Sequence, residues 1–129
     1  MSWHNKVIDK LTKAKIFSRV ELVGVKIRAT LDEDRFLDIY FDPTTGSYSY
    51  ALIDLTLPYP GDKRAFGWDD YPHEHTPEIK KLRSHPHHFQ RRSSESVWIF
   101  EESPMRGDVE KEISIVIQAV RHYLKKRKR

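Results

Sequence analysis

The sequence predicts an α+β domain, in which an antiparallel β-sheet meander of four to five strands packs against N-terminal and C-terminal helices. Near both ends of the chain, apolar residues recur at helical spacing. In the middle they alternate with polar residues, as in half-buried strands. Short turns join the first strands, which favours antiparallel neighbours. The length of 129 residues suits a single domain over residues 1–129.

The two helices are predicted from their apolar stripes. The N-terminal stripe consists of Trp3, Val7, Ile8 and Leu11. It predicts a helix over residues 3–14. The C-terminal stripe runs from Val109 to Leu124, and Asp108 stands where a helix cap is expected. We expect both helices to pack on the same face of the sheet.

Three strands are expected in the first half of the chain. Residues 17–30 alternate and are rich in valine and isoleucine, which predicts one strand with Gly24 at a bulge. Residues 35–42 repeat the alternation, and residues 47–57 continue it after a turn over 42–46 that contains a proline and a glycine. Three consecutive strands with short connections predict a meander.

Residues 58–94 are less regular and contain five prolines. A fourth strand is expected over 63–68, and a short helix over 76–85, where Thr76 suits the N-cap and a proline occupies the first helical position. Residues 96–102 predict the last strand. The remainder of this region is expected to be ordered loop, and loops of that length are usually functional.

Composition restricts the function. The chain has no cysteine, which excludes disulfides and thiolate metal sites. No apolar run is long enough to span a membrane, and the N-terminus does not resemble a signal peptide, so we expect a cytoplasmic protein without a membrane partner. The net charge of +4 lies largely in the tail, since six basic residues and no acid follow from Arg121. The basic tail over 125–129 either attracts phosphate groups or is simply a solvated end.

The segment GWDDYPHEHTPEIKKLRSHPHHFQ (67–90) holds five of the seven histidines. Histidine gives and takes protons near neutral pH, so one interpretation is acid–base catalysis. RNA is cut without a metal if one group deprotonates the 2′-hydroxyl and another protonates the leaving oxygen. His73, paired with His87 or His88, is the candidate couple, and Asp69 is the candidate that orients a histidine ring.

Further residues are candidates for holding RNA. Trp68 and Tyr71 are expected to stack on bases. Arg64, Arg91 and Arg92 flank the segment and are expected to contact phosphates. Tyr48 and Tyr50 share one face of a strand, mainly for packing, with their hydroxyls as further candidates. We expect Trp68, Asp69, His73 and at least one of His87 and His88 to converge in one cleft beside Tyr48 or Tyr50.

Two other interpretations of the histidines stay open. The ring nitrogens and nearby carboxylates would suit zinc, manganese or nickel in a metal-dependent hydrolase. Because the spacing of these groups is irregular, we expect no metal and no other cofactor. The third interpretation is structural, with histidines on a loop that bond to the backbone and to one another. A non-catalytic module that binds nucleic acid or protein is the corresponding alternative function.

Three short motifs resemble a known family. Their residues are Gly46, Tyr48, Ser49 and Tyr50, then Trp68, Asp69, Pro72 and His73, then Pro86, His87 and His88. In this order and spacing the chain resembles the TumE-family toxins of toxin–antitoxin systems. It departs at Asp70, where the family pattern has asparagine, and at Glu74 and Gln90, where it has histidine. The resemblance implies a toxin with a cognate antitoxin protein as partner, and the residues suggest RNA as a second partner. Homodimerisation is left open.

Overall fold

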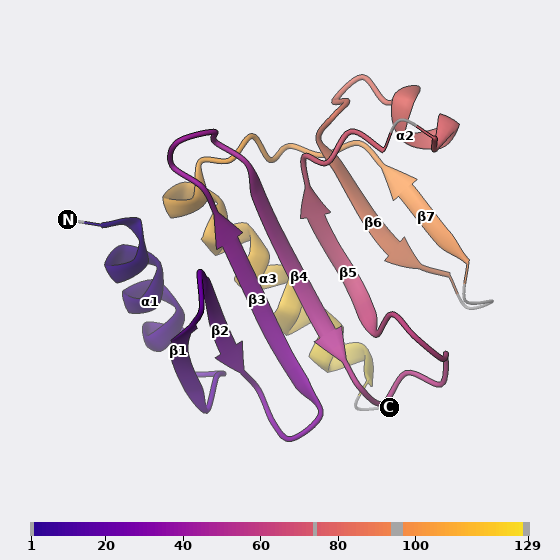
Figure 1. The fold of residues 1–129 in the computed structure, drawn as a ribbon. Helices are drawn as coiled ribbons and strands as arrows, with labels where there is room; N and C mark the ends of the chain where they lie inside the picture. Colours follow the sequence, from indigo (N-terminus) through magenta and orange to yellow (C-terminus); the bar gives the residue numbers. More distant parts are fainter. Residues whose placement is uncertain (1, 74, 94–96, 128–129) are drawn as a thin grey trace.

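The computed structural model describes residues 2–73, 75–93 and 97–127 (Figure 1). Over these residues the chain forms one seven-stranded antiparallel sheet in which each strand pairs with the next along the chain. The strands are β1 (Arg19–Val23), β2 (Lys26–Thr30), β3 (Arg35–Phe41), β4 (Tyr48–Asp54), β5 (Arg64–Asp69), β6 (His88–Arg92) and β7 (Trp98–Glu101). The helices are α1 (Trp3–Lys13), α2 (Pro77–Lys80) and α3 (Val109–Arg127).

Helices α1 and α3 pack against each other and cover one face of the sheet, which we call the helix face (Figure 1). The apolar side chains of the strands point to this face, and those of Leu37, Ile39 and Leu52 are fully buried there. Val7 of α1 and Ile113 of α3 meet them from the other layer. Each such side chain stabilises the fold by about 1.5–3 kcal/mol on burial.

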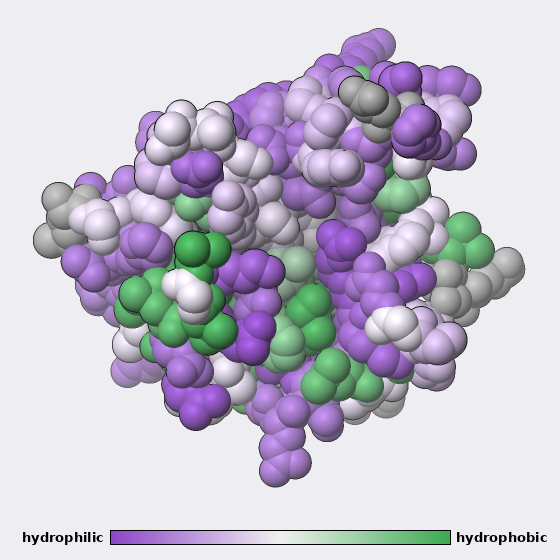
Figure 2. Space-filling model, viewed as in Figure 1, coloured by the Kyte–Doolittle hydropathy of each residue, from purple (hydrophilic) through white to green (hydrophobic). Residues whose placement is uncertain are grey.

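The opposite face of the sheet is not covered by α1 or α3, and we call it the open face. Because strand residues alternate between faces, the positions that follow the core residues present polar groups here. One row of Cα partners runs Tyr40–Ser49–Asp69–His88 across β3 to β6. Figure 2 shows this side as largely hydrophilic, with an apolar patch. Leu22, Val23 and Val25 of the β1–β2 hairpin are among the exposed apolar residues.

The predicted fold class is confirmed, but the sheet has seven strands rather than four to five. The segment 17–30 was expected as one strand and is a hairpin of β1 and β2. Gly24 lies in its turn with a φ of +63°, a conformation that glycine adopts without steric cost. Strand β6 was not predicted, because its apolar alternation is reduced to the single Phe89 among polar neighbours.

The ends of the predicted elements differ in small ways. Helix α2 is shorter than expected, and β7 lies inside the predicted last strand, whose first residue is outside the described residues. Helix α3 continues to Arg127, so the predicted basic tail is helical up to that residue. Its last two residues, 128–129, lie outside the described part of the chain. Among the described residues, no helix has the length and apolar character needed to cross a bilayer.

Candidate functional site

Three of the predicted residues meet on the open face, where β5 ends and β6 begins. Asp69 is the last residue of β5 and pairs with His88, the first residue of β6, while His73 comes from the loop after β5. Nε2 of His88 lies 3.3 Å from Oδ1 of Asp69, and Nε2 of His73 lies 4.0 Å from the same oxygen. We call Asp69, His73 and His88 the open-face centre.

The ring of His88 is held in one orientation. Its Nδ1 lies 3.0 Å from the carbonyl oxygen of Pro86. A carbonyl oxygen only accepts, so Nδ1 carries the proton of this bond. Nε2 therefore faces Oδ1 of Asp69 and Oε1 of Gln90, which is 3.1 Å away. Both oxygens only accept, so an Nε2 without a proton makes no hydrogen bond to either of them. The side chain has no solvent exposure, so this orientation is fixed by protein atoms.

His73 is the least satisfied member of the centre. Its Nε2 is buried and has no hydrogen-bond partner among the described residues. Its φ of +45° is unusual for a residue with a side chain, and such strain is typical of functional sites. Loss of hydration lowers the pKa of His73, with Asp69 opposing this shift and His88 and Arg64 adding to it. The shift favours the neutral imidazole, in which one ring nitrogen carries no proton.

The two oxygens of Asp69 have different neighbours. Oδ1 accepts the backbone N–H of Tyr71 at 2.9 Å and faces both imidazoles. Oδ2 lies 3.7 Å from Nη1 of Arg64. The ring of Tyr71, which is 65% exposed, meets the ring of His73 edge-on with centroids 4.7 Å apart. A guanidinium and an exposed aromatic ring thus border the centre.

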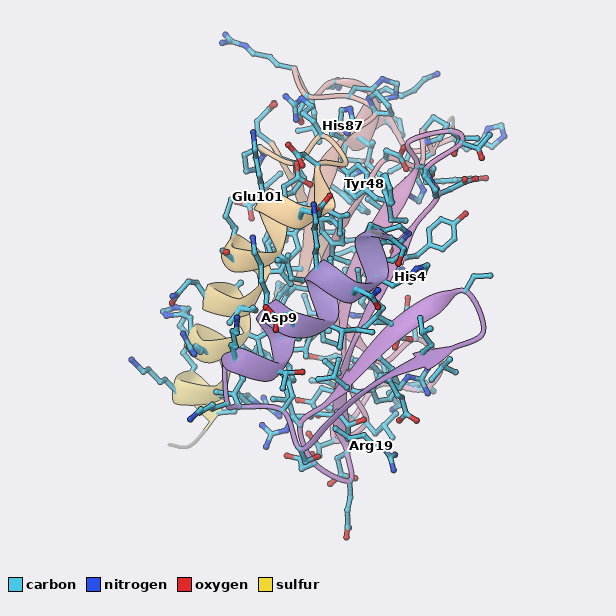
Figure 3. All side chains as sticks on the ribbon, turned by 90° about the vertical axis from the view of Figure 1, so that its left-hand side faces the viewer. His4, Asp9, Arg19, Tyr48, His87 and Glu101 are labelled. Atoms are coloured by element: carbon cyan, nitrogen blue, oxygen red, sulfur yellow. The ribbon has the colours of Figure 1, made fainter. Side chains whose placement is uncertain are left out.

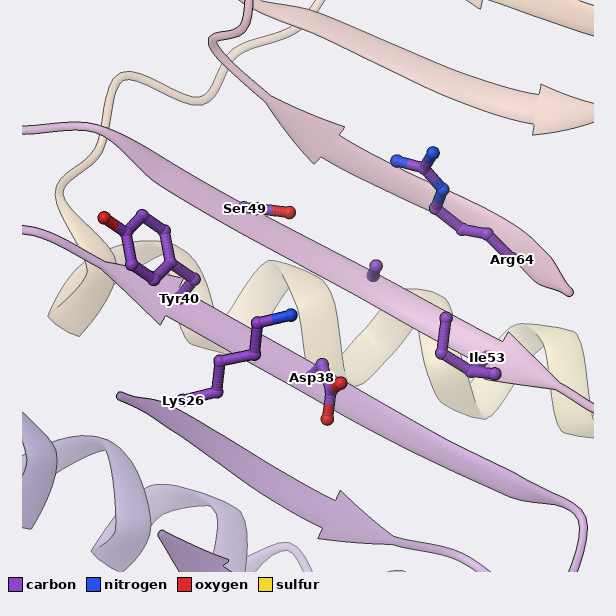
Figure 4. A pocket seen from close by; sticks show the side chains of 7 residues that line it. Lys26, Asp38, Tyr40, Ser49, Ile53 and Arg64 are labelled. Carbon is purple, nitrogen blue, oxygen red and sulfur yellow. The ribbon is translucent and has the colours of Figure 1, made fainter. Parts of the chain in front are cut away.

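A groove on the open face adjoins the centre (Figure 4). Its lining residues are Lys26, Asp38, Tyr40, Ser49, Ala51, Ile53 and Arg64. Ser49 is the Cα partner of Asp69, and Arg64 contacts that carboxylate, so both connect the groove to the centre. Nε of Arg28 pairs with the Asp38 carboxylate at 2.8 Å. Two basic residues line the groove, Lys26 from β2 and Arg64 from β5.

His87, although adjacent to His88, belongs to a different group of residues on the helix face. Its Nδ1 is 2.8 Å from the hydroxyl oxygen of Tyr48, and Figure 3 labels both residues. The single O–H of Tyr48 donates to the carbonyl of Met105 at 3.2 Å. The hydroxyl of Tyr50 donates to Glu112 of α3 at 2.8 Å. Burial, and then the positive charge of Arg106, lower the pKa of His87. We call Tyr48, Tyr50, His87 and Glu112 the helix-face cluster.

The structure divides the predicted site residues between two faces. Arg64 and Tyr71 border the open-face centre. Tyr48 lines one pocket together with Asp69 and Tyr71. The side chains of His87, Tyr48 and Tyr50 nevertheless form the helix-face cluster, so of the two adjacent histidines only His88 meets Asp69 and His73. The reason is that neighbouring strand residues point to opposite faces.

The other predicted binding residues lie elsewhere. Trp68 is 6% exposed and packs in the core against Phe89, so its ring offers little surface to a base. Arg91 is paired with Glu101 at 2.8 Å and lines a groove beside α3. Arg92 places its guanidinium over Trp98, 3.9 Å from the ring centroid.

Several residues near the site were not predicted from the sequence. Gln90 touches His88, and Ser49 links the groove to Asp69. The ring of Trp98 lies near two guanidinium groups, that of Arg92 and that of Arg64, the latter 5.4 Å from its centroid. Recognition of β6 as a strand would have found Gln90, because it occupies the same face as His88 two positions later.

Comparison with protein families supports the resemblance noted in the sequence. A family model described as Toxin TumE matches residues 6–124, which include the open-face centre and the helix-face cluster. Separate comparisons with curated proteins and with solved structures gave no match. A toxin of a toxin–antitoxin system implies an antitoxin as its partner. Because the match covers most of the chain, this protein belongs to the Toxin TumE family.

Proposed function

We propose that this toxin cleaves RNA at the open-face centre and that its antitoxin suppresses this activity. The observation that carries the proposal is the buried Nε2 of His73, which has no hydrogen-bond partner among the described residues. Leaving a buried polar atom unpaired costs about 1–3 kcal/mol. Such a cost is understandable where the atom serves a reaction rather than the fold.

Cleavage of RNA requires a base near the 2′-hydroxyl and positive charge near the phosphate. When a base takes the proton of the 2′-hydroxyl, the 2′-oxygen attacks phosphorus and the bond from phosphorus to the 5′-oxygen breaks. Negative charge develops on the phosphate oxygens, and the leaving 5′-oxygen takes up a proton from water or from a protonated side chain. The side chains of the open-face centre, Asp69, His73 and His88, are the candidates that remove the proton of the 2′-hydroxyl. Arg64, whose Nη1 lies 3.7 Å from Oδ2 of Asp69, would stabilise the developing charge.

The surroundings suit a single RNA strand. The groove carries Lys26 and Arg64 for contacts to phosphates. Tyr71 presents an exposed ring next to His73 on which a base can stack. A purely binding module would use the same groove but would not need the unpaired nitrogen of His73, and this separates the two functions experimentally.

The test is to express the toxin without its antitoxin and to follow growth and the integrity of total RNA. Purified protein is then incubated with labelled RNA. We expect wild type to cleave, and Asp69→Asn and His73→Ala to lose about 100-fold or more of the rate. His75→Ala is the matched control, because His75 is exposed and belongs to the same histidine-rich segment but not to the centre. Wild-type protein that binds RNA without cutting it would instead support the binding module.

A further inference from the structure

We infer that the open-face centre binds one divalent transition-metal ion through Nε2 of His73, Nε2 of His88 and Oδ1 of Asp69. The inference deepens the proposed function and rests on it only for what the ion would do during cleavage. Binding of the ion itself follows from the positions of these three side chains. The irregular spacing in the sequence argued against a metal, but the fold brings the ligands together from two strands and a loop.

The distances suit a metal site that is close to its bound geometry. All three donor atoms lie within 4.8 Å of one another. With zinc bonds of about 2.0–2.1 Å, tetrahedral geometry separates two ligand atoms by about 3.3 Å. The separation of His88 from Asp69 is 3.3 Å, and that of His73 from Asp69 is 4.0 Å. The side chain of His73 is 31% exposed, so it has room to close the remaining gap.

The hydrogen bonds around the centre direct the ligand atoms inward. A histidine that binds metal through one nitrogen usually donates its other N–H to a carbonyl or carboxylate. His88 has this arrangement, because its Nδ1 donates to the carbonyl of Pro86. Asp69 is held by the N–H of Tyr71 and by Arg64, which fixes the side of the carboxylate that faces the imidazoles. A cation would also satisfy the buried Nε2 of His73.

The donor set selects the class of metal. Two imidazoles and one carboxylate suit zinc, manganese, iron or nickel, whereas magnesium and calcium favour oxygen ligands. Three protein ligands leave a fourth position for water or a phosphate oxygen, as in catalytic rather than structural zinc sites. Arg64 and Tyr71 border the centre, so a phosphate that reached this position would also meet a guanidinium.

The experiment measures binding in the absence of RNA. Protein without an affinity tag is treated with chelator, dialysed and titrated with Zn²⁺ by calorimetry, and Co²⁺ is added to a second sample for its visible spectrum. We expect one Zn²⁺ per chain and Co²⁺ bands typical of low coordination number. His73→Ala, His88→Ala and Asp69→Asn should each weaken binding by about 100-fold or more, at least the loss seen when a group that supports a ligand is removed. Circular dichroism checks that each variant is folded.

The control variant is again His75→Ala, which we expect to bind Zn²⁺ within about threefold of wild type, well below the loss expected for a ligand. The inference is overturned if folded wild type binds no stoichiometric metal, or if His75→Ala weakens binding as much as His88→Ala does. Failure of the proposed function gives a different result, in which Zn²⁺ binds as expected but RNA stays intact. Cleavage by metal-free protein in excess chelator would show that the ion takes no part in cleavage, and the ribonuclease would stand without it.

Discussion

The open-face centre and the helix-face cluster are built from adjacent residues, His88 and His87, yet they differ in how their polar atoms are satisfied. In the helix-face cluster, each tyrosine hydroxyl has a close partner, and Glu112 accepts three hydrogen bonds. In the open-face centre, His73 keeps a buried nitrogen without a partner in the described structure and has a positive φ.

This difference in hydrogen bonding indicates that the helix-face cluster serves the fold, whereas the open-face centre serves the reaction. Buried polar groups in proteins are nearly always hydrogen-bonded, so a satisfied cluster needs no explanation beyond stability. A strained residue with an unpaired nitrogen is destabilising, and it persists when the rest of the fold over-determines it. We therefore expect mutations in the open-face centre to change activity more than stability, and those in the helix-face cluster to do the reverse.

The largest expected effect is on the rate of RNA cleavage. His88→Ala removes a group in the open-face centre and should lower the rate by about 10²–10⁴-fold, the usual contribution of a positioned acid or base. His87→Ala removes one hydrogen bond to Tyr48 and should cost about 1 kcal/mol of stability, with a change in rate below tenfold. Initial rates and urea unfolding of both variants test this pair. Equal losses of rate would show that the two clusters act as one site.

The next effect is on stability. Glu112 is nearly buried and accepts from the hydroxyl of Tyr50 and from the backbone N–H groups of Arg106 and Gly107. Glu112→Ala leaves three donors unpaired, each costing about 1–3 kcal/mol, so the free energy of unfolding should fall by about 3 kcal/mol or more.

The matched control for this change is Glu110→Ala, two positions earlier in α3. Its carboxylate forms an exposed ion pair with Lys6 at 3.0 Å. Exposed pairs of this kind contribute less than about 1 kcal/mol. Urea unfolding compares the two variants directly. A loss at Glu112 no larger than at Glu110 would mean that the helix-face cluster does not stabilise the fold.

Part of the fold and of the open-face centre could be predicted from the sequence. The apolar stripes gave both long helices, and period-two alternation gave most of the sheet. The composition of the 67–90 segment pointed to Asp69, His73 and His88. These signals are local, since each depends on residues within one element or one loop.

The division between the two faces could not be predicted without β6. The sequence contains no feature that distinguishes His87 from His88. They are assigned to different faces only by the register of β6 against β5, in which His88 is opposite Asp69. The alternation in β6 is carried by polar residues, so hydrophobicity gave no signal. The partners of Tyr50 and Tyr48 lie in and before α3, about sixty residues away, and such contacts depend on tertiary packing.

The stability of the protein at alkaline pH tests how strongly the helix-face cluster is buried. Burial, followed by the hydrogen bond and charge of Glu112, raises the pKa of Tyr50 above its usual value. Burial likewise raises the pKa of Tyr48. A group whose pKa is higher in the folded state contributes stability below its unfolded pKa, about 10 for tyrosine, and loses it as the pH rises further.

Stability should therefore be insensitive to these two tyrosines up to about pH 10 and fall above it, by about 1.4 kcal/mol per pH unit for each tyrosine. Tyr50→Phe should remove one such contribution and reduce the slope accordingly. Urea unfolding above pH 10, together with tyrosinate absorbance, measures both quantities. If Tyr50 ionises near pH 10 in the folded protein, the helix-face cluster is more hydrated than its burial indicates.

The smallest expected effect comes from Tyr48→Phe, and it tests whether the helix-face cluster contributes to chemistry at all. The substitution keeps the ring, whose centroid lies 5.7 Å from that of His87, and removes only the hydroxyl that bonds to His87 and to the carbonyl of Met105. We expect a loss of about 1 kcal/mol in unfolding free energy, the usual net contribution of a hydrogen bond. The rate of RNA cleavage should stay within about threefold of wild type, since no atom of the open-face centre is changed, whereas loss of a positioned acid or base costs at least about 100-fold. Cleavage that fell 100-fold in folded Tyr48→Phe protein would make the hydroxyl part of the reaction and would return His87 to the list of catalytic candidates.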